Sequence, residues 1–156
     1  MSSPYKINTE LDDLIFLGEM DVTYHPERGF ITLDAWKKAR EVRSFFYNDI
    51  LPFLPAEEKN NLNIQIRRAA VSATANIAEG YGKYNAADEI RFYLISRGSQ
   101  NELLDHLITC SDLKFINEDL FESGKAKLTD SIKILNGYIN WVIKTYQNKN
   151  GKINQK

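Results

Sequence analysis

The chain has 156 residues and a formal net charge of −1, with 43% apolar and 12% aromatic residues. This length and composition favour a single globular domain with a real core and argue against global disorder. One cysteine excludes an intramolecular disulfide framework, and no apolar run approaches the ~20 residues of a membrane helix or follows a basic segment as in a secretory signal. We therefore expect a soluble cytoplasmic protein without a membrane partner.

Charge is unevenly distributed along the chain. Residues 1–31 contain two bases and six acids, a charge of −4, whereas the remainder carries +3. We predict an acidic N-terminal extension over 1–31, a helical domain over 32–147 and a flexible tail, rich in Asn and Lys, over 148–156. Within the extension, "LDDLIFLGEM" could form one short helix or a docking strand. A charge of +3 is far below that of a dedicated nucleic-acid binder, so charge alone neither supports nor excludes that function.

The first two helices are predicted from apolar residues at three-to-four spacing. Thr32 should cap a helix over 33–51, which two prolines then end. The second proline fits the first turn of a helix over 55–81, with Gly80 and Gly82 as its C-terminal caps. The expected apolar faces are Leu33, Trp36, Ala39, Val42, Phe46 and Ile50 in the first helix, and Leu62, Ile66, Ala69, Ala70, Ala73 and Ile77 in the second.

Two asparagines mark the starts of two further helices. Asn85 should cap a third helix that ends near Leu113, and Asn117 should cap a fourth. Their expected apolar stripes are Ile90, Leu94, Leu104 and Ile108, followed by Leu120, Leu128, Ile132, Leu135, Ile139, Val142 and Tyr146. Almost no sustained two-residue alternation is present, so strands are rejected. The predicted fold is all-α, an antiparallel up-down four-helix bundle.

Three kinds of chemistry are disfavoured by spacing. The run Gly80–Lys83 lacks the spacing of a phosphate-binding loop, and no strand precedes it. A di-iron bundle needs Glu-x-x-His pairs, but neither His25 nor His106 has a glutamate three residues before it. We expect no metal and no other cofactor. Cys110 fits a small buried residue better than a nucleophile.

Charged residues are concentrated on the hairpin of the second and third helices. In an antiparallel pair, the numbers of facing residues have a constant sum, and this holds for Glu79 with Arg91 and for Arg68 with Glu102. Helical geometry places the two members on each helix within ~20° of one another. We therefore predict two ion pairs across the hairpin. A catalytic interpretation would require Glu79 or Glu102 to have a free carboxyl with a shifted pKa.

Small residues on the same hairpin should allow close approach, with Ser72 facing Gly98. Arg97 and Asn101 fall within the predicted apolar stripe of the third helix, where a buried arginine needs a partner. A carboxylate from another helix, another subunit or a polar ligand could supply that partner. The polar group thus has a structural or interface role or recognises RNA or protein.

Two segments of this hairpin resemble a known family. The segments "IQIRRAAVSATANIAEGYGK" and "RFYLISRGSQNELLDHL" are similar to the core motif of four-helix bundle proteins encoded within intervening sequences of bacterial 23S ribosomal RNA genes. The match spans roughly residues 30–147. Its motif positions are Gln65, Arg68, Ala69, Ser72, Asn76, Ile77, Ala78, Glu79, Gly80, Phe92, Gly98, Ser99, Glu102 and Leu103.

The resemblance implies a homopentamer with a central channel and no enzymatic activity. It also implies kinship with the accessory variability determinant proteins of diversity-generating retroelements, which bind a reverse transcriptase and nucleic acid. Lys83 departs from the usual arginine, and Arg97 places a bulkier charged side chain at a close contact.

The leading functional hypothesis is a non-enzymatic oligomeric scaffold that binds RNA or DNA, or a ribonucleoprotein partner, through a basic face. The resemblance suggests a reverse transcriptase as that partner. The alternative is a pure protein-protein interaction module in which the acidic extension docks a polymerase or toxin-like partner. The candidate nucleic-acid-binding residues are Lys37, Lys38, Arg40, Arg43, Arg67 and Lys83. The candidate structural or interface residues are Arg68, Ser72, Asn76, Glu79, Gly80, Arg91, Arg97, Gly98, Ser99 and Glu102.

Overall fold

The computed structural model describes residues 29–83 and 85–153, and within these ranges every regular element is helical. The predicted extension therefore lies outside the described residues up to residue 28. The elements in chain order are η2 (Phe30–Thr32), α2 (Asp34–Phe45), η3 (Phe46–Ile50), η4 (Leu51–Phe53), η5 (Ala56–Asn60), α3 (Leu62–Tyr81), α4 (Ala86–Asp112) and α5 (Glu118–Ile153).

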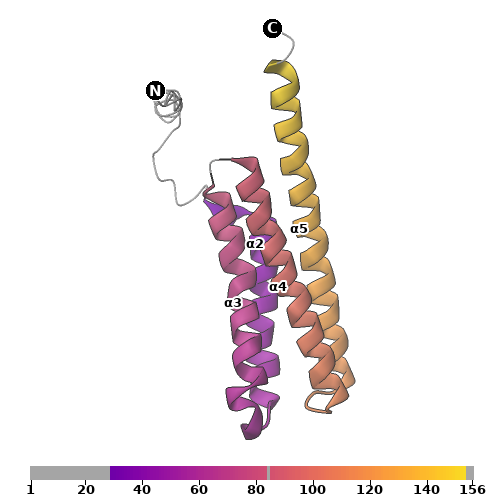
Figure 1. Ribbon diagram of the computed structural model, residues 1–156. Coiled ribbons are helices and arrows are strands. Elements are labelled where there is room, and N and C mark those ends of the chain that lie inside the picture. The colour runs from indigo at the N-terminus through magenta and orange to yellow at the C-terminus, as the bar shows by residue number, and fades with distance from the viewer. Residues whose placement is uncertain (1–28, 84, 154–156) are drawn as a thin grey trace, which may run out of the picture.

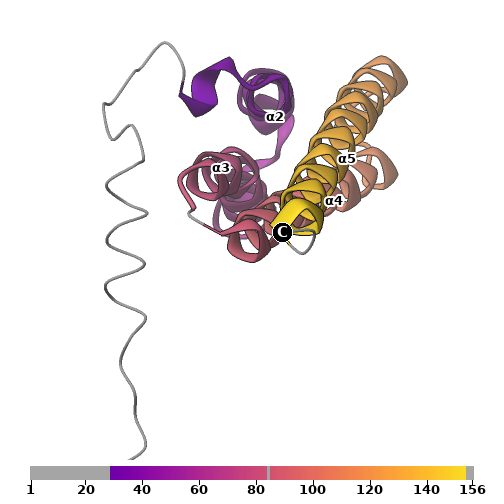
Figure 2. The same ribbon diagram turned by 90° about the horizontal axis from the view of Figure 1, so that it is seen from above.

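Four long helices pack side by side and alternate in direction along the chain (Figure 1). Seen from above, α2, α3, α4 and α5 follow one another around the bundle, and each packs against its two neighbours (Figure 2). The prediction of an all-α fold with four packed helices is confirmed. Helix α5 is the longest and projects past the other three at one end (Figure 1).

The first predicted helix is built from α2 followed by a π-helical turn, η3. Thr32 does not cap it: its hydroxyl donates to the carbonyl of Gly29 at 2.9 Å, and Leu33 is the N-cap residue. The π-helical geometry over Phe46–Ile50 allows more apolar side chains to enter the core. A π-helix pairs residues five apart, which brings such positions toward the same face. Phe46 and Leu51 are both buried at this spacing.

The second predicted helix is interrupted near its start. Pro55 precedes the short 3-10 helix η5, and α3 begins only at Leu62, after an irregular Asn61. The carboxylate of Glu58 accepts hydrogen bonds from the Asn61 side chain at 2.8 Å and from the Leu62 amide at 3.2 Å. Glu58 therefore satisfies a free amide at the start of α3, a function that sequence reasoning had given to no residue.

The expected ends of the later helices are largely confirmed. The side chains of Asn85 and Asn117 each accept a hydrogen bond at 2.9 Å from the amide three residues later, as helix caps do. Gly82 is the C-cap of α3, whereas Gly80 lies inside that helix and is buried. Helix α5 continues to Ile153, past the predicted end of the helical domain at residue 147.

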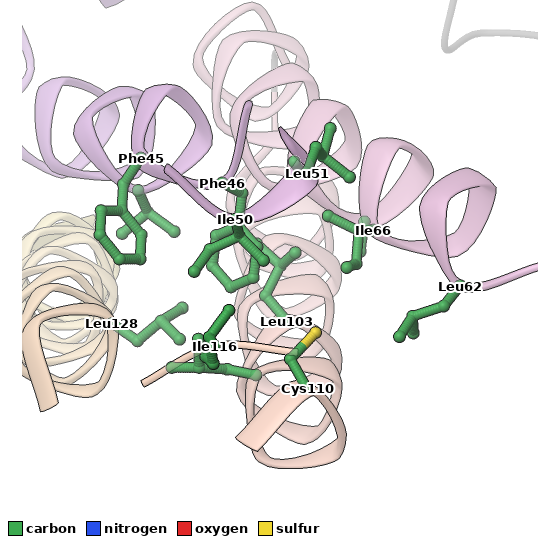
Figure 3. Packing of buried hydrophobic residues seen from close by; sticks show 14 residues of the cluster. Phe45, Phe46, Ile50, Leu51, Leu62, Ile66, Leu103, Cys110, Ile116 and Leu128 are labelled. Atoms are coloured by element: carbon green, nitrogen blue, oxygen red, sulfur yellow. The ribbon is translucent and has the colours of Figure 1, made fainter. Parts of the chain in front are cut away.

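Two groups of buried apolar side chains form the core. One lies where η3 and the ends of α3, α4 and α5 meet (Figure 3), and the other lies toward the α3–α4 turn. The predicted stripes of α2, α3 and α5 are buried or partly buried. The labelled members of the first group are Phe45, Phe46, Ile50, Leu51, Leu62, Ile66, Leu103, Cys110, Ile116 and Leu128.

The predicted apolar face of the third helix is wrong. Leu94 and Ile108 are 41% and 42% exposed, and Ile90 and Leu104 are only partly buried. The face of α4 that enters the bundle is Tyr93, Ser96, Ser99, Gln100, Leu103, Leu107 and Cys110. Polar residues occupy its middle, and two of them, Ser96 and Ser99, form hydrogen bonds with α3.

No helix within the described ranges is both long and apolar enough to cross a membrane.

Candidate nucleic-acid interface

Three of the six candidate basic residues are locally neutralised. The Lys37 and Lys83 ammonium groups pair with Asp34 at 3.1 Å and with Glu79 at 3.0 Å. Lys38 bridges two carboxylates, Glu41 and Asp130, both at 3.1 Å, and these hydrogen bonds raise the pKa of its ammonium group. Their charges are therefore less available to an anionic partner than those of the arginines.

Three arginines border a groove between α2 and α3. Arg43 of α2 donates from Nη1 to the hydroxyl of Thr74 at 2.8 Å, across to α3. The Arg67 guanidinium lies 4.9 Å from the ring centre of Tyr47, and its Nε donates to Asn63 at 2.7 Å. Arg68 follows it on the exposed side of α3. These contacts hold Arg43 and Arg67 in place and use only part of the five N–H donors that each guanidinium carries.

Acidic side chains are absent from the lining of this groove among the described residues. Two adjoining hollows share Tyr47 and Val71, and Val71 is 48% exposed between them. The full lining is Arg43, Ser44, Tyr47, Asn48, Arg67, Arg68, Val71, Ser72, Ala75 and Asn76. We call this surface the arginine groove. It offers cations, amides, hydroxyls and one aromatic ring, which are the groups that contact phosphates and bases.

A further hollow, separate from the two that form the arginine groove, lies on the other side of α2, against α5. It adjoins the arginine groove, because Ser44 and Asn48 line both. Its cations are Lys37, Arg40 and Lys127, but Glu41 and Asp49 lie among them. Arg40 also packs 5.7 Å from the ring centre of Trp36. Because acids lie among its cations, this hollow between α2 and α5 is a weaker anion site than the arginine groove.

The two predicted ion pairs across the hairpin do not form. Glu79 pairs with Lys83 on its own chain segment, and the Glu102 carboxylate lies 3.6 Å from His106 Nε2. Among the described residues neither Arg68 nor Arg91 has an ionic partner, and both are exposed. The error has a physical reason: partners four residues apart along one helical segment or its end meet without any constraint from the neighbouring helix.

The predicted antiparallel pairing of α3 and α4 is nevertheless correct. The Ser99 hydroxyl donates to Ser72 Oγ at 2.8 Å, and the Ser96 hydroxyl donates to the Ala73 carbonyl at 2.6 Å. Asn76 donates to both the carbonyl and the hydroxyl of Ser72 at 2.8 and 2.9 Å. Serines therefore mediate the close approach. Gly98, expected at this contact, is exposed with open space beside it.

Arg97 has a partner, although not a carboxylate. Its Nη1 donates to Asn136 Oδ1 of α5 at 3.0 Å, and its side chain is partly buried. Asn101, the other residue that the bundle pattern did not explain, is exposed. Arg97 thus ties α4 to α5 within the subunit.

A partly buried carboxylate that sequence reasoning missed lies near the α3–α4 turn. The Tyr93 hydroxyl donates to Glu89 Oε1 at 2.8 Å, and the Tyr93 ring packs on Tyr138 with 5.3 Å between ring centres. Burial raises the pKa of the Glu89 carboxyl, and burial together with Glu89 raises the pKa of the Tyr93 hydroxyl. The spacing of four residues between Glu89 and Tyr93, which places both on one face of a helix, could have predicted this hydrogen bond from the sequence.

Two further predictions concern reactive groups. Cys110 is buried, and this burial, followed by the charge of Glu58, raises the pKa of its thiol to about 11. A thiol of this kind is a poor nucleophile at neutral pH. Within 29–83 and 85–153, His, Cys, Asp and Glu side chains nowhere gather in threes as a metal site would require.

The sequence matches one family model, described as "23S rRNA-intervening sequence protein", over residues 32–137. A solved structure from Bacteroides thetaiotaomicron is also similar: a protein of unknown function from the S23 ribosomal protein family. It shares 27% identity with a TM-score of 0.61, and the alignment covers 67% of this chain and 97% of that one. No curated protein matches the sequence.

Proposed function

Because the chain belongs to the 23S rRNA-intervening sequence protein family, we propose that it is a non-enzymatic, self-associating scaffold that binds structured RNA through the arginine groove. The observation that carries this proposal is the set of three arginines, Arg43, Arg67 and Arg68, in a groove whose described lining contains no acid. A partner protein such as a reverse transcriptase would share the bound nucleic acid.

The groove suits a nucleic acid better than a compact anion. Its arginines come from two helices and are fixed by different neighbours, Thr74 for Arg43 and Tyr47 with Asn63 for Arg67. Such an extended row can follow successive phosphates, whereas a single phosphate needs converging donors. The overall charge of −1 predicts weak attraction outside the groove, so binding should depend on these few residues.

Reversing two charges in the groove should abolish most RNA binding. In a gel-shift titration with a structured RNA at low salt, Arg67→Glu/Arg68→Glu should weaken binding roughly tenfold or more, since each lost charged hydrogen bond costs about 1.5–3 kcal/mol. The slope of log K against log salt should become shallower by about 2 if two phosphate contacts are lost.

The matched control changes the same number of charges elsewhere. Lys59→Glu/Lys133→Glu alters two exposed lysines outside the groove and shifts the net charge equally. It should keep RNA affinity within about twofold, because screening weakens distant surface charges. Equal losses in both double variants, or no binding by the unaltered protein, would overturn the groove as the binding site.

Self-association is supported by exposed apolar side chains on α4. Leu94, Ile95 and Ile108 are exposed, although they lie on a helix whose other face is packed in the bundle. Exposed apolar patches of this kind are typical of interfaces. The proposed second copy would cover this stripe, and the family resemblance implies five copies.

Light scattering tests the association directly. We expect a solution mass above the 18.0 kDa of one chain, and Leu94→Glu/Ile108→Glu should return the mass to that of one chain. Leu113→Glu, at an exposed apolar position just after α4, is the control and should leave the assembly intact. A monomeric unaltered protein would refute the oligomeric part of the proposal while leaving RNA binding to be judged by the gel shift.

A further inference from the structure

The outermost ring of an aromatic stack on α5 is exposed. Trp141 is 58% exposed and stacks on Tyr138 with 5.6 Å between ring centres and 17° between planes. Tyr138 in turn packs against the fully buried Tyr93 of α4. The indole is therefore held in place by the rings beneath it while much of its surface meets solvent. Aromatic rings presented in this way are the platforms on which proteins stack unpaired bases.

Trp141 belongs to one exposed face of α5, which we call the tryptophan face. At about 100° per residue around the helix, this face carries Lys133, Gly137, Asn140, Trp141 and Lys144, and each of them is exposed. The surface beside the indole is open, because nothing lies within 4 Å of a Cβ added at Gly137, four residues before Trp141. A flat ligand could therefore approach the indole without meeting a neighbouring side chain of Gly137.

Charge on this part of α5 favours an anionic ligand. Residues 131–153 contain four lysines and no acid. The acid that precedes them, Asp130, is paired with Lys38 of α2 at 3.1 Å. A second copy docked through the same face would bring like charges together, and residues 147–153 offer it only one large apolar side chain, Ile153. A polyanion therefore fits the tryptophan face better than another copy of the chain does.

The tryptophan face is separate from the arginine groove. Tyr93 and Tyr138 belong to or pack on the core group near the α3–α4 turn, whereas Ile66, which precedes Arg67, belongs to the other core group. Trp141 also lies beyond residue 137, where the family match ends, on the part of α5 that leads to its projecting end (Figure 1). Neither the groove nor the matched region thus accounts for this exposed indole.

We propose that the tryptophan face binds single-stranded nucleic acid, with an unpaired base stacked on Trp141 and adjacent phosphates near Lys133 and Lys144. A duplex does not suit this site, because the faces of its bases are covered by their neighbours in the stack. The site goes beyond the arginine groove, since it selects unpaired nucleotides whereas the arginines contact phosphates. RNA and DNA single strands share this chemistry, and the experiment below distinguishes them.

The fluorescence of Trp141 tests the proposal directly. The chain has two tryptophans, so Trp36→Phe leaves Trp141 as the single indole. Oligouridine or oligodeoxythymidine of about twelve nucleotides, a length that single-strand sites commonly span, should quench its emission to a plateau, because a stacked base quenches an indole. The oligonucleotide with the lower Kd identifies RNA or DNA as the source. A blunt duplex of equal length and inorganic polyphosphate, which offer charge without free base faces, should leave the emission unchanged.

The anisotropy of a labelled oligonucleotide gives a second readout with Trp36 in place. Trp141→Ala should weaken binding of the single strand between about fivefold and a hundredfold, the contribution of one stacked base. Trp141→Phe should recover part of the loss, because it restores a ring. Phe53→Ala is the matched control: it removes a ring that is 56% exposed in η4, and it should keep the affinity within about twofold because no base stacks there.

Several results would overturn the inference. Unchanged emission on adding either oligonucleotide, or equal losses from Trp141→Ala and Phe53→Ala, would show that the indole stacks no base. Equal affinities for polyphosphate and oligouridine would reduce the site to lysines that bind any polyanion. Quenching that grows with protein concentration alone would identify a second copy as the occupant.

The same titration separates this site from the arginine groove. In an Arg67→Glu/Arg68→Glu background the oligonucleotide should still quench Trp141, even if structured RNA no longer binds. Survival of the quenching would support the tryptophan face whether or not the groove proves to be an RNA site. Loss of the single strand in this background, together with full binding by Trp141→Ala, would instead place the single strand in the groove and overturn the inference.

Discussion

Replacing Phe46 with alanine should lower the free energy of unfolding by about 3–5 kcal/mol, the usual cost of deleting a buried phenyl ring. Phe46 is 0% exposed and lies edge-on to Phe45 with 5.9 Å between ring centres. Its neighbours come from α3, α4 and α5 as well as from its own segment (Figure 3). Because several helices converge on it, none of them can close the resulting cavity alone.

Urea denaturation followed by circular dichroism measures this effect. The midpoint should fall while the slope with denaturant stays constant, which identifies a change in stability. Phe53→Ala is the control: Phe53 follows seven residues later, in η4, and is 56% exposed. It should cost no more than about 1 kcal/mol, since little of its area leaves water on folding. Comparable losses for the two variants would contradict the core position of Phe46.

The packing of α3 could be predicted from sequence, but the buried face of α4 could not. In α3 the apolar residues themselves mark the buried face. In α4 the buried face includes Ser96, Ser99 and Gln100, and large apolar residues such as Leu94 lie outside. Both serines form hydrogen bonds with α3, which satisfies their hydroxyl groups and makes their burial possible. Hydrophobic periodicity does not register a contact of this kind.

The candidate site was only partly predictable for a related reason. Sequence reasoning selected Arg43 and Arg67 as basic residues but assigned Arg68 to an ion pair with Glu102. A constant sum of residue numbers identifies the positions that face one another in an antiparallel helix pair. It does not show where the charged end of a long side chain lies. Glu102 lies against His106 instead, and Arg68 joins the groove. Whether a basic side chain is free to bind an anion depends on the carboxylates next to it, and the three-dimensional structure is needed to identify them.

Substituting valine for Gly80 should destabilise the hairpin by about 3 kcal/mol, at the upper end of overpacking effects. A Cβ there would lie 2.6 Å from Tyr93 Cε1 and 3.1 Å from the Glu89 carbonyl. The Tyr93 ring cannot move aside easily, because its hydroxyl is bonded to Glu89 and its face packs on Tyr138. The motif glycine is therefore required by this contact and not by a left-handed backbone.

Gly98→Ala is the matched control for Gly80. Both glycines lie within helices of the same hairpin, but nothing lies within 4 Å of a Cβ added at Gly98. Alanine there should raise the unfolding free energy by about 0.5–1 kcal/mol through helix propensity alone. The opposite signs of the two substitutions separate steric contact from backbone preference in one denaturation series.

A double variant identifies the clash partner. If the Tyr93 ring is what Gly80 accommodates, Gly80→Val should cost much less in a Tyr93→Leu background than in the unaltered protein, because the smaller side chain leaves room. Double-mutant cycles detect such coupling between contacting residues at about 0.5–3 kcal/mol. Strict additivity would instead place the cost of valine in the Glu89 backbone contact, and α3 and α4 would then be held apart by main chain and not by the tyrosine.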